Sequence, residues 1–131
     1  MVWAIIDDRF VDTAVTTPQS HAVTNKQNAT NNIIEISVVP TIVTTNYIMT
    51  VNVSFDNSTW RPIYTSSTMT GVYWRRVIFS ASGAPSDTET ATSSATVNKS
   101  GVMEPYIQVT LTPTGALTAT TDILFTGTGM E

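Results

Sequence analysis

The chain has 131 residues, of which 41% are hydrophobic and only 12% are charged, and its net charge is −4. A chain of this length fits one domain that buries about 65–70% of the surface its unfolded form would expose. Nucleic-acid binding is disfavoured, because it needs several phosphate-neutralising side chains on one face and the chain has only six basic residues. The absence of cysteine excludes a disulfide framework and a thiolate metal site.

Threonine and serine replace the missing charges, since they account for 37 of the 131 residues. Threonine is β-branched and fits a pleated sheet, while its hydroxyl still bonds to water. A surface of hydroxyls is cheaper to desolvate than a surface of charges, which suits a protein that packs among neighbours. The composition therefore favours either an assembly component or simply a threonine-rich β-domain.

The N-terminal residues 1–32 differ from the rest of the chain. Residues 2–6, VWAII, are too few to span a membrane and have no basic region before them, so we expect neither a membrane helix nor a signal peptide. The residues that follow are mostly polar, with one short strand expected near His21–Thr24. We expect residues 1–32 to form an extended arm that reaches a neighbouring subunit, where each large apolar side chain would return about 1.5–3 kcal/mol on burial. The alternative is that VWAII adds an edge strand to its own domain.

From residue 33 the pattern becomes regular, and residues 33–131 are expected to form a β-sandwich domain. In the stretch 47–64, apolar and polar residues alternate up to a turn at Asp56-Asn57-Ser58, and a second short strand follows. This pattern predicts a β-hairpin. Further strands are expected at residues 33–40, 72–80, 92–97, 106–112, 116–120 and 122–126.

Several short strands separated by turns, with no convincing helix, predict an all-β fold. The expected architecture is an antiparallel β-sandwich of jelly-roll or immunoglobulin-like type. Alternation assigns one face of each strand to the core. The predicted core residues are Ile34, Ile36, Val51, Val53, Phe55, Ile107, Val109, Leu111, Ile123 and Phe125.

No group of residues in the sequence has the pattern of a catalytic site. The only histidine, His21, lies in a polar stretch without a nucleophile motif such as G-x-S-x-G. Asp7, Asp8 and Asp12 lack the spacing and the terminal glutamate of a calcium loop. The other acidic residues mostly fall in expected turns and loops, so no pair is indicated for glycoside hydrolysis. We therefore expect a protein that is not an enzyme and has no cofactor and no bound metal.

Aromatic and arginine side chains are better candidates for a binding surface. Tyr73 and Trp74 are adjacent in an expected strand and so face opposite ways, as do Arg75 and Arg76. One residue of each pair must lie on an inward face unless another subunit covers the strand. An exposed aromatic beside an arginine is a common interface anchor, but ordinary packing and a sugar-stacking platform are open alternatives. Such a platform would be built from Trp60, Tyr73, Trp74 and Tyr106.

Two segments of the body resemble a recurrent β-sandwich domain of tailed-phage virion proteins. They are SFDNSTWRPIY and PYIQVTLTPTGALTATTDILFTGTG. In that domain a strand ends in a Ser-x-Asp-Gly-x-x-Trp turn, and a later Tyr-(Val/Ile)-Arg-Val strand precedes a Ser/Thr-Gly-Thr turn and a last apolar strand. This sequence departs from the pattern at Asn57, where glycine is common, and at Gln108, where arginine is common. The matching positions are Ser54, Asp56, Asn57, Trp60, Tyr106, Ile107, Val109, Thr114, Gly115 and the strand 122–127.

The resemblance implies a non-enzymatic structural protein of the virion, assembled in the host cytoplasm. The most direct expectation is a capsid decoration or cement protein that stabilises the phage head through subunit contacts. Its expected partners are the major capsid protein or other virion proteins, and a homo-oligomer is expected, with a trimer favoured. The alternative is a carbohydrate-binding or adhesion module of a phage tail or fibre, which would bind a glycan. The interface candidates are Trp3, Ile5, Ile6, Tyr73, Trp74, Arg75 and Arg76.

Overall fold

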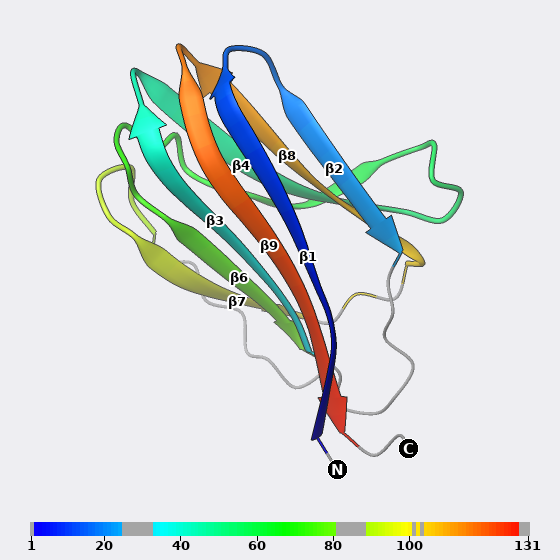
Figure 1. Cartoon of the computed structure of the whole chain (residues 1–131). Coiled ribbons are helices and arrows are strands. Elements are labelled where there is room, and N and C mark those ends of the chain that lie inside the picture. Colours follow the sequence, from blue (N-terminus) through cyan, green and yellow to red (C-terminus); the bar gives the residue numbers. More distant parts are fainter. Residues whose placement is uncertain (1, 25–32, 81–88, 101, 103, 129–131) are drawn as a thin grey trace.

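The computed structural model describes residues 2–24, 33–80, 89–100, 102 and 104–128, and for residues 2–7, 127 and 128 it describes the backbone alone. These residues form strands, turns and loops, with no helix among them and therefore none that could cross a membrane. The strands lie in two sheets that pack against each other (Figure 1). The described strands are β1 (Val2–Val15), β2 (Gln19–Thr24), β3 (Ile33–Val43), β4 (Asn46–Ser54), β5 (Arg61–Thr65), β6 (Arg75–Ser80), β7 (Ala95–Ser100), β8 (Tyr106–Thr114) and β9 (Leu117–Thr128).

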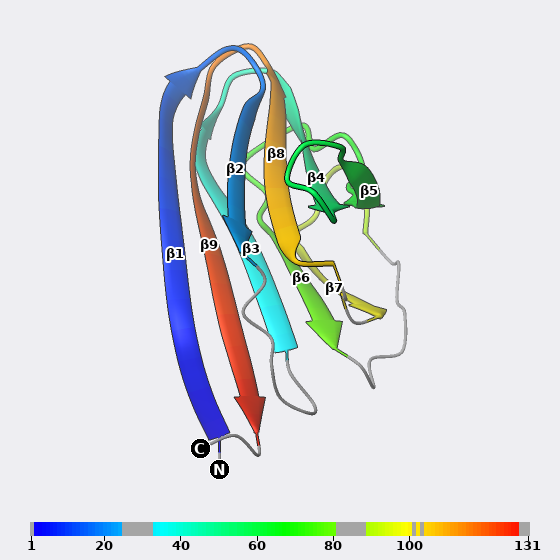
Figure 2. The same cartoon turned by 90° about the vertical axis from the view of Figure 1, so that its right-hand side faces the viewer.

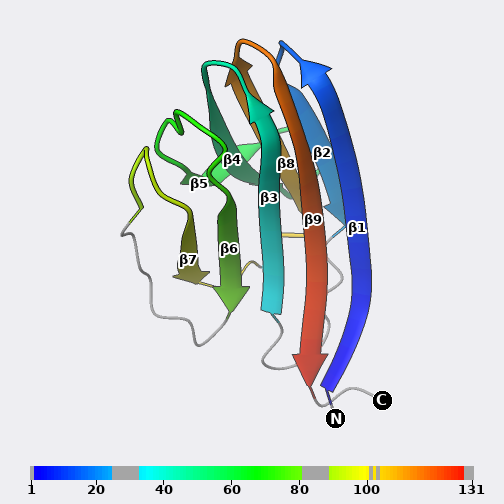
Figure 3. The same cartoon turned by 60° about the vertical axis from the view of Figure 1, so that its left-hand side comes forward.

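The strand order places early strands beside late ones. Sheet A has the order β1-β9-β3-β6-β7, and sheet B has the order β2-β8-β4-β5 (Figures 2 and 3). The pairs β1–β9, β2–β8, β3–β6 and β4–β5 are nested, because each later strand among β1 to β4 pairs with an earlier strand among β5 to β9. Consecutive strands alternate between the sheets from β1 to β4, and the β4–β5 hairpin lies at the centre of the nest.

The core fills the space between the two sheets, and the alternation of the sequence determines which side chains enter it. Nine of the ten predicted core residues are at most 1% exposed, and this part of the prediction is confirmed. They come from β3, β4, β8 and β9, which are interior strands of their sheets. The confirmed residues are Ile34, Ile36, Val51, Val53, Ile107, Val109, Leu111, Ile123 and Phe125.

Phe55 is the exception, because its side chain is 74% exposed. The strand β4 ends one residue earlier, at Ser54, so alternation no longer determines where Phe55 points. The chain turns immediately afterwards, since Asp56 Oδ1 accepts hydrogen bonds from the backbone N–H groups of Ser58 and Thr59. The predicted hairpin between β4 and β5 is confirmed, and the assignment of Phe55 to the core is wrong.

The N-terminal segment belongs to the sandwich. β1 pairs with β9 from Val2 opposite Thr128 to Val15 opposite Leu117, and β2 pairs with β8. The expected division into an arm (1–32) and a sandwich (33–131) must therefore be corrected for both strands, and the edge-strand alternative describes them. The charges of β1 obscured this, but an edge strand has only one neighbour and tolerates charged side chains toward solvent.

Four other expectations about the strands of sheet A change. β6 begins at Arg75, three residues later than expected, and β7 spans Ala95–Ser100 where 92–97 was expected. β6 and β7 run parallel, so the sandwich is not antiparallel throughout. The two strands expected at 116–120 and 122–126 are one continuous strand, β9.

Val53 and Phe55 provide a matched test of the core. Val53→Asp should lower the free energy of unfolding by about 3–5 kcal/mol, because it places an unpaired charge where Val53 is 1% exposed. Phe55→Asp should change it by no more than about 0.5 kcal/mol, since that site faces water. Urea denaturation followed by circular dichroism measures both values, and equal losses would contradict the described faces.

Removal of residues 2–24 tests the place of the N-terminal strands. The deletion uncovers β9 and β8, whose inward residues belong to the core, so we expect the cooperative thermal transition to be lost. Differential scanning calorimetry of the shortened and full chains makes the comparison. A shortened chain that melts at the temperature of the full chain would restore the prediction of a separate arm.

Candidate functional site

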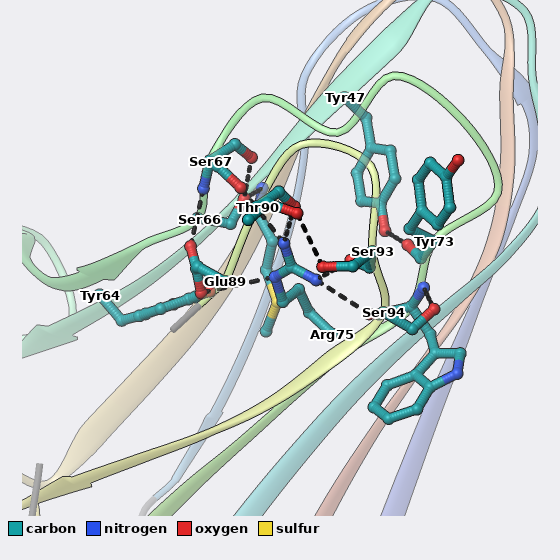
Figure 4. A network of polar contacts seen from close by, with 12 residues as sticks. Tyr47, Tyr64, Ser66, Ser67, Tyr73, Arg75, Glu89, Thr90, Ser93 and Ser94 are labelled. Atoms are coloured by element: carbon teal, nitrogen blue, oxygen red, sulfur yellow. Dashed lines mark hydrogen bonds and ion pairs between the residues drawn. The ribbon is translucent and has the colours of Figure 1, made fainter. Parts of the chain in front are cut away.

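Arg75, at the start of β6, is the largest fully buried side chain among the described residues, and it has no exposed surface. A buried charge is costly unless its donors find acceptors. The acceptors come from the chain itself (Figure 4). Arg75 Nη1 donates to the carbonyl oxygen of Ser93 at 2.6 Å, while Nη2 donates to the carbonyl oxygen of Thr90 at 2.7 Å and to Ser67 Oγ at 3.2 Å.

Glu89 supplies the opposite charge. Its Oε2 lies 3.4 Å from Arg75 Nε, and its side chain is 7% exposed. The same carboxylate accepts a hydrogen bond from the backbone N–H of Ser67 at 2.8 Å and another from the hydroxyl of Tyr64 in β5. The ion pair is therefore connected to strands of both sheets.

Two tyrosines act as donors around this ion pair. Burial raises the pKa of Tyr64, and the hydrogen bond to Glu89 and the charge of that carboxylate raise it further. Burial also raises the pKa of Tyr47, whose hydroxyl donates to the carbonyl oxygen of Tyr73 (Figure 4). Both hydroxyls therefore keep their protons at neutral pH.

This network holds the segment before β7 against the start of β6. Because the two strands are parallel, the chain must return after β6 to the end of the sheet where β6 begins. Thr90 and Ser93, whose carbonyls bind Arg75, lie just before β7, and Ser94 Oγ accepts a hydrogen bond from the backbone N–H of Trp74 at 3.0 Å. The charged groups are enclosed, so we assign the network a structural role.

The two predicted interface pairs are each divided between inside and outside. Tyr73 is partly buried and packs against the core, whereas Trp74 is 40% exposed. Arg75 is enclosed, whereas the side chain of Arg76 is 43% exposed. The prediction that one residue of each pair points inward is confirmed, and Trp74 and Arg76 are the more exposed members of the two pairs.

The three N-terminal interface candidates lie in β1. Trp3 is opposite Gly127 and Ile6 is opposite Phe125, with Ile5 at an irregularity in the pairing. Their side chains lie outside the described part of the structure.

The outer face of sheet A gathers most of the exposed apolar side chains. Val11 in β1 and Val39 in β3 are both opposite Thr120 of β9, so the three residues form a row across the sheet. Because Val38 is opposite Arg75, continuation of the register brings Trp74 beside Val39. Of the seven large hydrophobic side chains exposed among the described residues, five lie on this outer apolar face: Val11, Ile33, Val39, Ile42 and Trp74.

Among the side chains that the structure describes on the outer apolar face, two pairs of opposite charges are in contact. Arg9 Nε lies 2.7 Å from Asp122 Oδ1, between β1 and β9. Arg76 donates to Glu35 Oε1, between β6 and β3, and this hydrogen bond raises the pKa of Arg76. Because each of these two ion pairs is neutral, a partner that covers the face leaves none of their four charges buried and unpaired.

The four aromatics of the expected sugar platform do not share a face. Tyr73 packs toward the core, and Trp74 lies on the outer face of sheet A. Trp60 directly precedes β5, and Tyr106 begins β8, both in sheet B. A platform made of all four residues is therefore not formed.

His21 pairs with a residue that the sequence did not suggest. Its Nε2 lies 2.9 Å from Asp12 Oδ2, and its ring stacks on Phe10 with centroids 4.5 Å apart. Asp12 and Phe10 belong to β1 and His21 belongs to β2, so the contact joins the two sheets at one edge. No group of three or more His, Cys, Asp or Glu that could hold a metal occurs among the described residues.

A hollow of about 420 Å³ lies beside the turn between β4 and β5. Phe55, Asp56 and Thr59 contribute from the turn, and Arg61 and Glu104 also line the hollow. Sequence reasoning selected this turn but missed the hollow, because Phe55 was assigned to the core. The polar residues that surround an aromatic one in SFDNSTWR were the available signal.

Comparison of the chain with protein-family models, with curated proteins and with solved structures gave no match.

Adjacent arginines provide a matched test of the buried network. Arg75→Met should lower the free energy of unfolding by about 3–5 kcal/mol, because it leaves the carboxylate of Glu89 without its buried partner. Arg76→Met removes a partly exposed ion pair and should cost less than about 1 kcal/mol. Urea denaturation of both variants gives the values.

The double variant Arg75→Met/Glu89→Gln separates charge from packing. It should recover at least about 1 kcal/mol relative to Arg75→Met alone, because the uncompensated negative charge is gone. A double variant that loses as much as the sum of the two single variants would show that the ion pair contributes nothing.

Proposed function

We propose that this chain is a structural component of a phage virion, most specifically a capsid decoration or cement protein that works through the outer apolar face. The observation that carries the proposal is that five of the seven exposed large hydrophobic side chains share that face. Monomeric proteins rarely expose contiguous apolar patches larger than roughly a few hundred Å², and such patches mark interaction sites. The aromatic Trp74 is the type of residue that dominates binding at such interfaces.

The strand order supports a jelly roll over an immunoglobulin-like sandwich. An eight-stranded roll results when four nested antiparallel pairs fold over into two sheets, and β7 is then an addition at the edge of sheet A. In immunoglobulin domains the first two strands share a sheet, whereas β1 and β2 lie in different sheets here. Jelly rolls occur in viral capsid proteins and in lectins, so the topology is compatible with both expected functions.

Backbone conformation at two positions supports the resemblance to tailed-phage virion domains. Asn57 has φ 59°, and asparagine is one of the few residues that tolerates the left-handed region in place of glycine. Gly115 has φ 83°, and a Cβ at that position would lie 2.5 Å from Thr44 Oγ1. The backbone at both positions therefore suits glycine, which is the residue that the phage pattern has there.

The chemistry of the outer apolar face suits a permanent contact. Its apolar side chains would each return about 1.5–3 kcal/mol on full burial, and its ion pairs are already neutral. In the homo-oligomer, for which a trimer is favoured, the partner is a second copy of this chain. On the assembled head the partner is the major capsid protein or another virion protein. In a trimer the face would meet a different surface of the neighbour, because a rotation by a third of a turn does not place the same patch on itself.

Charge insertion on the outer apolar face tests this function. Val39→Glu/Trp74→Glu should convert the oligomer into a monomer and abolish cosedimentation with phage heads, while the melting temperature stays near that of the parent chain. The control is Thr112→Glu, which places one negative charge at an exposed position of sheet B. Light scattering coupled to size exclusion gives the mass. If the double variant keeps the mass and head binding of the parent chain, the outer apolar face is not the contact.

A further inference from the structure

The hollow beside the β4–β5 turn combines an apolar wall with fixed polar groups. Phe55 is 74% exposed and lines the hollow, whereas Val53, which also lines it, is 1% exposed. Binding pockets for small molecules are typically apolar with a few placed polar groups, and their volumes begin near 300 Å³. A hollow of about 420 Å³ falls within that range.

Asp56 is held in one orientation by the turn that it builds. Its Oδ1 accepts hydrogen bonds from Ser54 Oγ at 2.9 Å and from the backbone N–H groups of Ser58 at 2.9 Å and Thr59 at 2.8 Å. These hydrogen bonds hold the pKa of Asp56 at about 2, below its ordinary value of 3.8. The carboxylate is therefore ionised at neutral pH, and its position costs a ligand little ordering entropy.

Arg61 and Glu104 provide donors and an acceptor in the same lining. Arg61 Nη2 donates to Glu104 Oε1, and this ion pair places the guanidinium relative to the hollow. A guanidinium carries five N–H donors, so the ion pair leaves donors for a ligand hydroxyl. Carboxylate acceptors and guanidinium donors together recognise groups that both donate and accept hydrogen bonds.

We propose that this hollow binds a neutral pyranose sugar. A pyranose has a flat C–H face that can pack on the ring of Phe55, and a rim of hydroxyls that each donate and accept. Asp56 and Glu104 would accept from these hydroxyls, and Arg61 would donate to them. The three charged side chains sum to one negative charge, which disfavours phosphate and other anions.

The proposed sugar site is independent of the proposed subunit contact. The hollow adjoins the loop between β4 and β5 of sheet B, which extends away from the sandwich at the right of Figure 1. The outer apolar face belongs to sheet A. Sugar binding can therefore fail while head binding is confirmed, and the reverse is equally distinguishable.

The test is a titration of the ¹⁵N-labelled full chain with methyl glycosides of glucose, galactose, mannose and N-acetylglucosamine. At least one glycoside should shift the amide signals of Phe55, Asp56, Thr59 and Arg61 with a dissociation constant near ~1 mM, and Phe55→Ala should weaken it roughly tenfold. Val72→Ala removes an exposed apolar side chain outside the hollow and should bind like the parent chain. Arg61→Met is the second variant, and it should also weaken binding.

Two further probes distinguish other ligands of the same hollow. N-acetyl-lysine amide tests a cation, and inorganic phosphate tests an anion. The proposal is overturned if no glycoside shifts these signals, if the lysine amide or phosphate shifts them more strongly than every glycoside, or if Phe55→Ala and Arg61→Met both bind like the parent chain.

Discussion

Arg75 carries its charge where water does not reach, and a large part of sheet A depends on how that charge is accommodated. Its donors bind carbonyl oxygens just before β7, and its ion-pair partner Glu89 is held by Tyr64 of the opposite sheet. These contacts bring the returning chain back to the start of β6, which is the condition for a parallel strand at this edge. A hydrophobic residue at position 75 could fill the space, but it could not bind the carbonyls of that segment.

The inward orientation of Arg75 at the start of β6 also determines which side chains lie on the outer face of sheet A. Because Arg75 points into the sandwich, its neighbours Trp74 and Arg76 point out, with Trp74 beside Val39 of β3. The outer face thereby combines apolar side chains with neutral ion pairs. Sheet B differs, since its hollow contains an ionised carboxylate and a guanidinium around one exposed ring. The outer face of sheet A is therefore suited to contact with another protein, and the hollow of sheet B to a small polar ligand.

Nested pairing makes the two ends of the chain depend on each other. Arg9 and Asp122 form an ion pair although 113 residues separate them in the sequence. β9 lies between β1 and β3 and contributes core residues, so sheet A is complete only when the last strand is in place. Pairing of such distant segments is slow compared with local hairpins, and the β4–β5 hairpin is the most local pair of the nest.

Alternation between neighbouring residues was enough to predict the all-β class, the hairpin and the inward faces of the interior strands, because that signal is local and strong where a strand has partners on both sides. It failed at Phe55, where a strand end is decided by the hydrogen bonds of Asp56. Alternation also failed to predict the strand β1, whose charged side chains are tolerated because one edge of this strand faces water. The sequence determined that one of Arg75 and Arg76 must point inward. Only the tertiary structure decided which one, because the choice depends on the side of sheet A that sheet B covers and on the carbonyls that the distant segment before β7 brings within reach.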